Sequence, residues 1–150
     1  MKESHKKMLD SAIKALNVFG VENKDIMVLG SIALDIVGLF PLNRHIAHDV
    51  DLMIRCDSTI EDKIRCMSKI MNVVDSSNIK NTSYNQSIIL NVSNVSINIW
   101  FVSKDYQFDT ILKLDNGVFV EKPIDCIKKK KSYHRVKDYE DIRNIIFQIL

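Results

Sequence analysis

Hydrophobic residues recur along this chain with two different periods, and the change of period predicts where helices and strands lie. The apolar positions within 8–19 follow helical spacing, which predicts an amphipathic helix that ends before Gly20. The short apolar run 26–30 (IMVLG) predicts a buried strand. The next run, 31–40 (SIALDIVGLF), predicts a helix that Ser31 caps and that Pro41 ends.

The segment 48–55 (HDVDLMIR) shows the alternation of a strand instead. Its two faces differ in chemistry, with Val50, Leu52 and Ile54 on the apolar face and Asp49, Asp51 and Met53 on the other. After it, Asp57 and Ser58 predict the N-terminal cap of a helix over about 59–74.

The second half of the chain is richer in β-branched and aromatic residues. These runs predict strands at 79–84 (IKNTSY), 87–92 (SIILNV) and 95–102 (VSINIWFV), and a hairpin at 110–122 with its turn at Asn116-Gly117. Pro123 predicts the start of a helix to about 132, and Asp138 the start of a last helix through Leu150. This order predicts one α/β (α+β) domain, residues 1–150, with a mixed β-sheet flanked by helices.

Composition narrows the class of protein. A chain of 150 residues is the size of one domain, and its formal charge of +2 is too small to indicate a nucleic-acid partner. The three cysteines are widely spaced without a CxxC pair, which indicates neither a zinc site nor disulfides and favours reduced thiols. We find no signal-peptide pattern and no apolar run of membrane-spanning length, so we expect a cytoplasmic protein without a membrane partner.

Two carboxylates on one strand face are the first sign of chemistry. Asp49 and Asp51 stand at i and i+2, so both side chains point the same way, and their charges repel unless a cation lies between them. Mg²⁺ usually takes one or two carboxylates together with substrate phosphates. Gly30 and Ser31 lie at the preceding strand-to-helix junction, where backbone N–H groups are able to bind a phosphate. Taken alone, two aspartates on a strand more often mark a polar, exposed strand face, and a Gly-Ser pair is very common.

These motifs together resemble the nucleotidyltransferase superfamily, which has the polymerase-beta-like fold, and in particular its small bacterial and phage members. The residues that match its first motif are Gly30, Ser31, Ala33, Leu34, Gly38, Arg44, His48, Asp49, Asp51 and Leu52. A weaker C-terminal pattern is matched by Pro123, Lys130, Arg135, Lys137, Asp138 and Asp141. The resemblance covers about residues 26–146.

The resemblance implies a reaction, a cofactor and partners. A hydroxyl would attack the α-phosphate of a nucleoside triphosphate, with Mg²⁺ or Mn²⁺ as cofactor and a protein, a tRNA end or a small molecule as acceptor. The family supplies a third carboxylate from a later strand, and the equivalent position here is Asn98. An amide cannot act as a base, which puts transfer in doubt while nucleotide binding survives. Asp105 and Asp109 are nearby acidic alternatives.

The basic residues near the C-terminus have two interpretations. Lys128 to Lys131 span one helical turn and cannot share one face, so a solvated helix is the plainer one. The sharper one places Lys130 and Lys137 against the triphosphate oxygens, with Arg135 nearby. The resemblance adds Arg44 to the nucleotide-binding residues. We expect Asp138 to act as an N-terminal charge of the last helix and Asp141 to pair with Lys137.

Three hypotheses about function follow from these motifs. The first is a Mg²⁺-dependent nucleotidyltransferase, with Asp49, Asp51 and Asn98 at its catalytic centre. The second is a weakened module of the same fold that binds nucleotide or a partner without transfer. The third, a nucleic-acid-binding protein that uses the lysine run, ranks lower because the run has few interleaved aromatic residues. Because family members often carry a separate acceptor-binding domain, we also expect a partner or a homo-oligomer.

Overall fold

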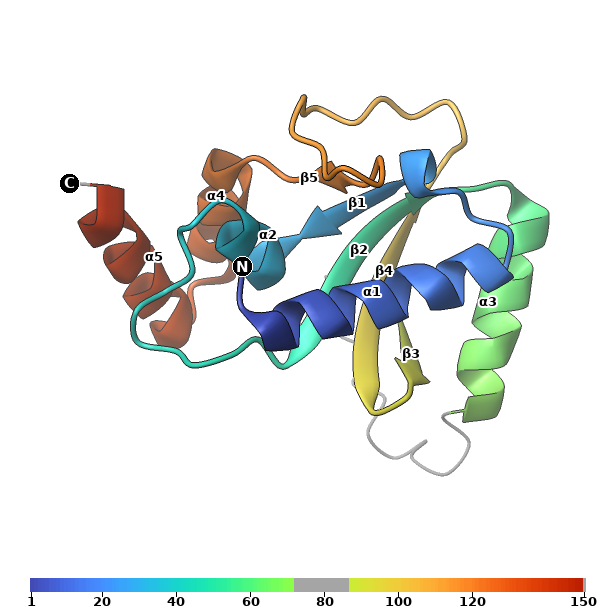
Figure 1. Ribbon diagram of the computed structural model, residues 1–150, viewed down its shortest axis with the longest axis horizontal. Helices are drawn as coiled ribbons and strands as arrows, with labels where there is room; N and C mark the ends of the chain where they lie inside the picture. Colours follow the sequence, from blue (N-terminus) through green and yellow to red (C-terminus); the bar gives the residue numbers. More distant parts are fainter. Residues whose placement is uncertain (72–86, 150) are drawn as a thin grey trace.

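The computed structural model describes residues 1–71 and 87–149, so the strand predicted at 79–84 and the end of the helix predicted at 59–74 lie outside the described residues. Within the described part, five α-helices and one 3-10 turn flank a five-stranded mixed sheet, which confirms the predicted α+β class (Figure 1). The elements, in chain order, are α1 (Glu3–Val18), η1 (Asn23–Asp25), β1 (Ile26–Leu29), α2 (Gly30–Ile36), β2 (Asp49–Arg55), α3 (Ser58–Met71), β3 (Ile88–Val92), β4 (Val95–Val102), β5 (Phe119–Val120), α4 (Pro123–Tyr133) and α5 (Val136–Ile149).

The strand order of the sheet, β3-β4-β2-β1-β5, places the strand with the two carboxylates at its centre. β2 runs parallel to β4 and antiparallel to β1. This register sets Asp51 between Leu29 on one side and Asn98 on the other. A central strand has partners on both edges, so the positions of its side chains are held from both sides.

The apolar faces of the strands form the core. Val50, Leu52 and Ile54 are fully buried, while the alternate residues of β2 are more exposed, as the sequence predicted. The amphipathic helix α1 crosses this apolar face of the sheet, and α3 packs beside β3 (Figure 1). Burying each such aliphatic side chain stabilises the fold by about 1.5–3 kcal/mol. The opposite face of β2 remains available for a polar site.

The second helix is shorter than the sequence predicted. α2 ends at Ile36, because Gly38 adopts a left-handed φ of +78°, well before Pro41. Ser31 is not its cap either: Leu29 holds the capping position, and the Ser31 hydroxyl accepts a hydrogen bond from the Arg44 guanidinium at 3.1 Å. The predicted roles of Ser31 and Pro41 in bounding this helix are therefore wrong.

Other predicted boundaries can be compared directly. The carboxylate of Asp57 accepts a hydrogen bond from the Ile60 N–H at 2.9 Å, which confirms it as a helix cap. The turn at Asn116-Gly117 is also confirmed, and Gly117 has a φ of +90°, although only Phe119–Val120 of that hairpin forms a named strand. The last helix begins at Val136, two residues before the predicted start.

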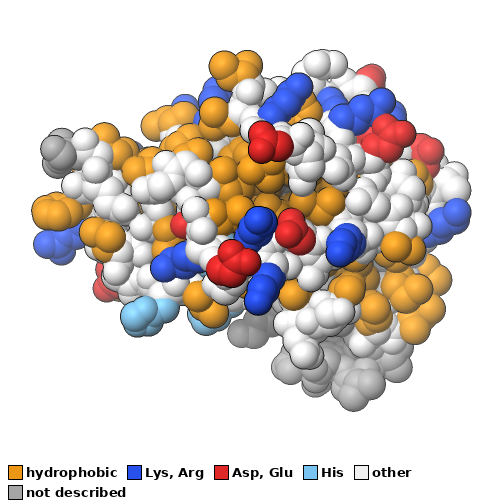
Figure 2. Space-filling model, in the orientation of Figure 1, with side chains coloured by type: hydrophobic (Ala, Val, Ile, Leu, Met, Phe, Trp, Pro, Cys, Tyr) orange, Lys and Arg blue, Asp and Glu red, His pale blue; other side chains and the backbone are white. Residues whose placement is uncertain are grey.

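The outer side of α5 is unusually apolar. Figure 2 shows hydrophobic side chains gathered over this helix at one end of the molecule. The exposed large residues there are Val136, Tyr139, Ile146, Phe147 and Ile149.

In the part of the chain that the structure describes, no helix combines the length and apolarity that a membrane crossing requires. The expected partner or homo-oligomer stays a prediction.

Candidate functional site

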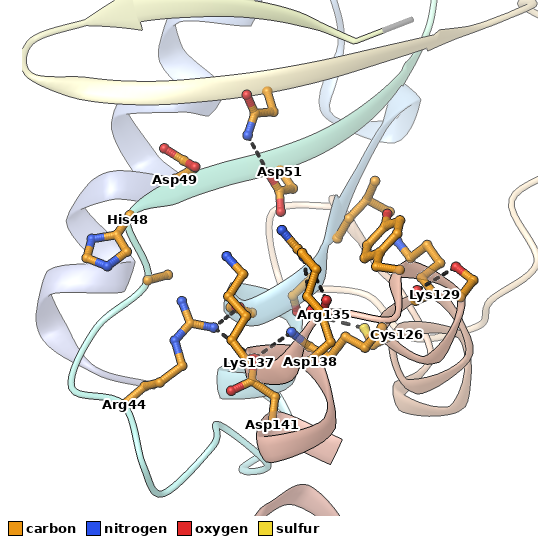
Figure 3. Close-up of a pocket in the computed structure, with 18 of the residues that line it drawn as sticks. Arg44, His48, Asp49, Asp51, Cys126, Lys129, Arg135, Lys137, Asp138 and Asp141 are labelled. Carbon is orange, nitrogen blue, oxygen red and sulfur yellow. Dashed lines mark hydrogen bonds and ion pairs between the residues drawn. The ribbon is translucent and has the colours of Figure 1, made fainter. Parts of the chain in front are cut away.

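A pocket of about 780 Å³ opens between the polar face of the sheet and helices α4 and α5. It gathers every residue to which the sequence assigned a binding or catalytic role: Gly30, Ser31, Arg44, Asp49, Asp51, Asn98, Lys130 and Lys137. Figure 3 shows the Asp51 side chain pointing from β2 toward the side chains that α4 and α5 contribute, with Asp49 further along the same strand near His48. The roles of these residues remain predictions, but their common location is a finding.

The acidic side of the pocket consists of Asp49 and Asp51 with Asn98 beside them. The parallel register pairs Asp51 with Asn98 on the neighbouring strand. The Asn98 amide nitrogen donates a hydrogen bond to Asp51 Oδ1 at 2.9 Å. Asn98 therefore stands where the resemblance implies a third carboxylate, and it offers Asp51 a donor instead of another negative charge.

The environment of Asp51 favours its protonated form. Burial is the largest effect and raises the pKa of this carboxyl above its usual range. The hydrogen bond from Asn98 lowers the pKa in part, and the negative charge of Asp49 raises it further. A cation placed between the two carboxylates would reverse this balance, because it stabilises their ionised forms.

The Asp51 side chain packs closely against Gly30. Gly30 has a φ of +64°, and a β-carbon at this position would lie only 2.8 Å from Asp51 Oδ2. The Asp51 carboxylate therefore takes up the space that a side chain at this position would need. The Gly30 N–H is also occupied, since it donates to Glu121 Oε2 at 2.9 Å. This N–H is therefore already bound in the free protein.

Sequence reasoning missed Glu121 and Lys129, a charged pair whose members both influence the pKa of Asp51. The buried Glu121 accepts from the Lys129 ammonium at 2.6 Å and from the Cys126 thiol at 3.0 Å. Burial is the largest single effect and disfavours the charged form of Lys129, but the charge and the hydrogen bond of Glu121, with smaller contributions from Cys126 and Tyr133, together raise the pKa of the ammonium. The sequence held a signal only for Glu121, an acid directly after the apolar run 118–120. Lys129 could not be singled out, because it is one of four successive lysines.

A second charged cluster joins α4, α5 and the loop before β2. Its centre is Asp141, which is 1% exposed and whose Oδ2 accepts from Lys130 at 2.9 Å and from Arg44 at 3.3 Å. Asp141 Oδ1 is buried without a hydrogen-bond partner among the described residues. The predicted pair of Asp141 with Lys137 is wrong, because Lys130 comes within reach across the α4–α5 packing. Lys137 makes no ion pair with the described residues.

Asp138 and Arg135 form a third pair at the pocket edge. Asp138 is fully buried in the first turn of α5 and accepts two hydrogen bonds from the Arg135 guanidinium, one of them at 3.0 Å (Figure 3). The position of Asp138 in the first turn agrees with its predicted role as an N-terminal charge of this helix. Its hydrogen-bond partner is the Arg135 side chain. Arg135 is thus bound to Asp138, whereas Lys137 of α5 lines the pocket without an ion pair among the described residues.

The donor set fits a metal ion that arrives with a ligand better than one held by the protein alone. Asp49 and Asp51 supply oxygen ligands, but the described residues contain no cluster of three His, Cys, Asp or Glu side chains suited to a metal. Mg²⁺ bound through two carboxylates completes its shell with waters and phosphate oxygens. The alternative acids do not line the pocket, since Asp105 bonds to Ser103 and Asp109 pairs with Lys122.

Comparisons of the chain with protein-family models, with curated proteins and with solved structures find no match. The resemblance to nucleotidyltransferases therefore stays a prediction.

Proposed function

We propose that this protein binds a nucleoside triphosphate together with Mg²⁺ or Mn²⁺ and transfers its nucleoside monophosphate to a hydroxyl group. One observation carries the proposal: two carboxylates on β2 and a set of cations line a single pocket. A metal–triphosphate complex needs both acidic and basic side chains in one pocket, because carboxylates bind the metal ion while lysine and arginine bind the phosphates. The acceptor in this proposal is a protein, a tRNA end or a small molecule.

The chain's residues have separable roles in this proposal. Asp49 and Asp51 hold the metal ion, which neutralises charge on the phosphates. Arg44, Lys130 and Lys137 bind the phosphate tail. The acceptor oxygen attacks the α-phosphorus, the bond to the bridging oxygen breaks, and pyrophosphate leaves with the electron pair. The hydroxyl proton passes to one of the two β2 carboxylates that line the pocket.

Asn98 favours a second candidate, a module that binds nucleotide without transfer. With an amide beside Asp51, the site carries two carboxylates where the resemblance implies three, so the pull on the attacking hydroxyl is weaker. The third hypothesis, nucleic-acid binding by the lysine run, loses support because Lys129 and Lys130 line the pocket, where they pair with Glu121 and Asp141, so the run does not present four lysines on one outer surface.

Calorimetry with Mg²⁺ and a non-hydrolysable nucleoside triphosphate tests binding. Asp51→Asn should abolish Mg²⁺-dependent binding while the protein stays folded, because the substitution keeps the shape of the side chain and removes a charge. Asp10→Asn on α1, which is exposed and outside the pocket, is the matched control and should bind like the wild type. Equal affinities in all three proteins would refute the proposal.

Single-turnover transfer from a labelled triphosphate separates the two candidates. For an active enzyme we expect Asn98→Asp to raise the rate of pyrophosphate release more than the affinity for nucleotide, because the third carboxylate acts in the transition state. A wild type and an Asn98→Asp variant that both bind nucleotide without releasing pyrophosphate would establish the binding module.

A further inference from the structure

Next to the polar pair of Asp51 and Asn98, the floor of the pocket becomes apolar. The parallel register of β2 and β4 pairs Met53 with Trp100, two residues further along each strand and on the same face. Both side chains are half-buried and line the pocket. The Trp100 ring makes no ring–ring or cation–π contact with the residues that the structure describes. The indole therefore has no aromatic or cationic partner among these residues.

The cations lie toward the other end of this floor. Because β1 is antiparallel to β2 with Leu29 opposite Asp51, the chain continues through Gly30 into Ser31 in the direction of Asp49. Arg44 is tied to Ser31 at 3.1 Å, so its charge lies on that side of Asp51.

Lys130 belongs to the same end, because it shares the Asp141 carboxylate with Arg44. The pocket thus has a polarity. It runs from cations, through the carboxylates of β2, to the apolar surface of Met53 and Trp100.

We propose that Met53 and Trp100 form the subsite for the base of the nucleoside triphosphate, with the base stacked on the Trp100 indole. This inference rests on the proposed function. Two residues along a strand cover about 7 Å, a span similar to that of the ribose between an α-phosphate and its base. A nucleotide with its α-phosphate at Asp51 and its β- and γ-phosphates toward Arg44 and Lys130 therefore places its base over Trp100.

The protein offers a direct optical readout of this contact. Trp100 is the only tryptophan in the chain, so its fluorescence reports on this one position. With Mg²⁺ present, a non-hydrolysable nucleoside triphosphate should quench the emission. Inorganic tripolyphosphate, which has no base, should compete for the pocket and leave the emission nearly unchanged. Equal changes with both ligands would overturn the stacking proposal.

Two variants separate stacking from simple apolar packing. Trp100→Phe keeps an aromatic face, whereas Trp100→Leu keeps an apolar side chain without one. Stacking of one base is worth roughly 1–3 kcal/mol, so calorimetry should show nucleotide binding about 5-fold to 150-fold weaker in Trp100→Leu and a smaller loss in Trp100→Phe. Tripolyphosphate affinity should be the same in all three folded proteins.

The outcomes distinguish this inference from the proposed function. If tripolyphosphate and nucleotide bind the wild type with equal affinity, the base subsite is refuted and the phosphate site stands. If Trp100→Leu weakens both ligands equally, Trp100 has a structural role and the inference is also refuted. If neither ligand binds the wild type with Mg²⁺, both proposals are refuted together.

Discussion

Gly30→Ala tests the contact on which the acidic side of the pocket depends. The substitution has two consequences that the structure separates. First, a residue with a β-carbon must adopt the left-handed φ of +64°, which costs about 1–2 kcal/mol. Second, the new methyl group would lie 2.8 Å from Asp51 Oδ2, so the carboxylate must move away.

Displacing Asp51 also breaks its hydrogen bond with Asn98, which is 2.9 Å long. For a half-buried carboxyl group we take about 1 kcal/mol for this loss, the central value for a hydrogen bond in a protein. The expected destabilisation of Gly30→Ala is therefore about 2–3 kcal/mol, or roughly 4–12 °C in the melting temperature of a domain this size.

Gly117→Ala is the matched control, because Gly117 has a φ of +90° and no atom within 4 Å of the added methyl group. We expect it to lose only the backbone contribution of about 1–2 kcal/mol. If the site binds metal and triphosphate as proposed, Gly30→Ala should weaken that binding about 10-fold or more, since a charged contact is worth about 1.5–3 kcal/mol. Gly117→Ala should bind like the wild type.

A double-mutant cycle isolates the clash. In an Asp51→Ala background the carboxylate is gone, so Gly30→Ala should cost no more than Gly117→Ala does. Thermal unfolding measures these differences, and calorimetry with Mg²⁺ and a non-hydrolysable triphosphate measures binding. If Gly30→Ala destabilises the wild type and the Asp51→Ala protein equally, the close approach of Asp51 is not what requires glycine here.

Three further predictions concern charged groups. Because the pKa of Asp51 is raised, mainly by burial, Mg²⁺ binding should release protons and strengthen as pH rises through that pKa; a pH-independent calorimetric titration would contradict this. Lys130→Ala should lower the free energy of unfolding by about 1.5–3 kcal/mol, because it leaves a buried acid with one weaker partner, whereas Lys128→Ala should have little effect in the same denaturant titration. The pKa of Asp35 is lowered, because the Lys2 N–H and His5 together outweigh its burial, so Asp35 stabilises the fold above its unfolded value of 3.8. The difference in melting temperature between wild type and Asp35→Asn should accordingly shrink as pH falls through the folded pKa, and a constant difference would refute this linkage.

The sequence by itself determined the elements and the facing of their side chains. Alternation along β2 was enough to place Asp49 and Asp51 on one face, because the two-residue period of a strand is a local property of the backbone. The same alternation puts Asn98 and Trp100 on one face of β4, where both line the pocket. Helix ends were less predictable, as α2 shows: its end depended on whether Gly38 would adopt a left-handed conformation, which Pro41 does not reveal.

Only the tertiary structure decided which charges meet. Gly30 and Glu121 are 91 positions apart, and Arg44 and Asp141 are 97 apart, so their contacts depend on the order of strands and on how α4 and α5 pack. A helical spacing of four residues favoured Lys137 as the partner of Asp141, but packing brought Lys130 closer. The direction of a side chain follows from the backbone geometry of a few neighbouring residues. A buried ion pair instead forms between opposite charges that the folded chain brings together away from water, whatever their separation in the sequence.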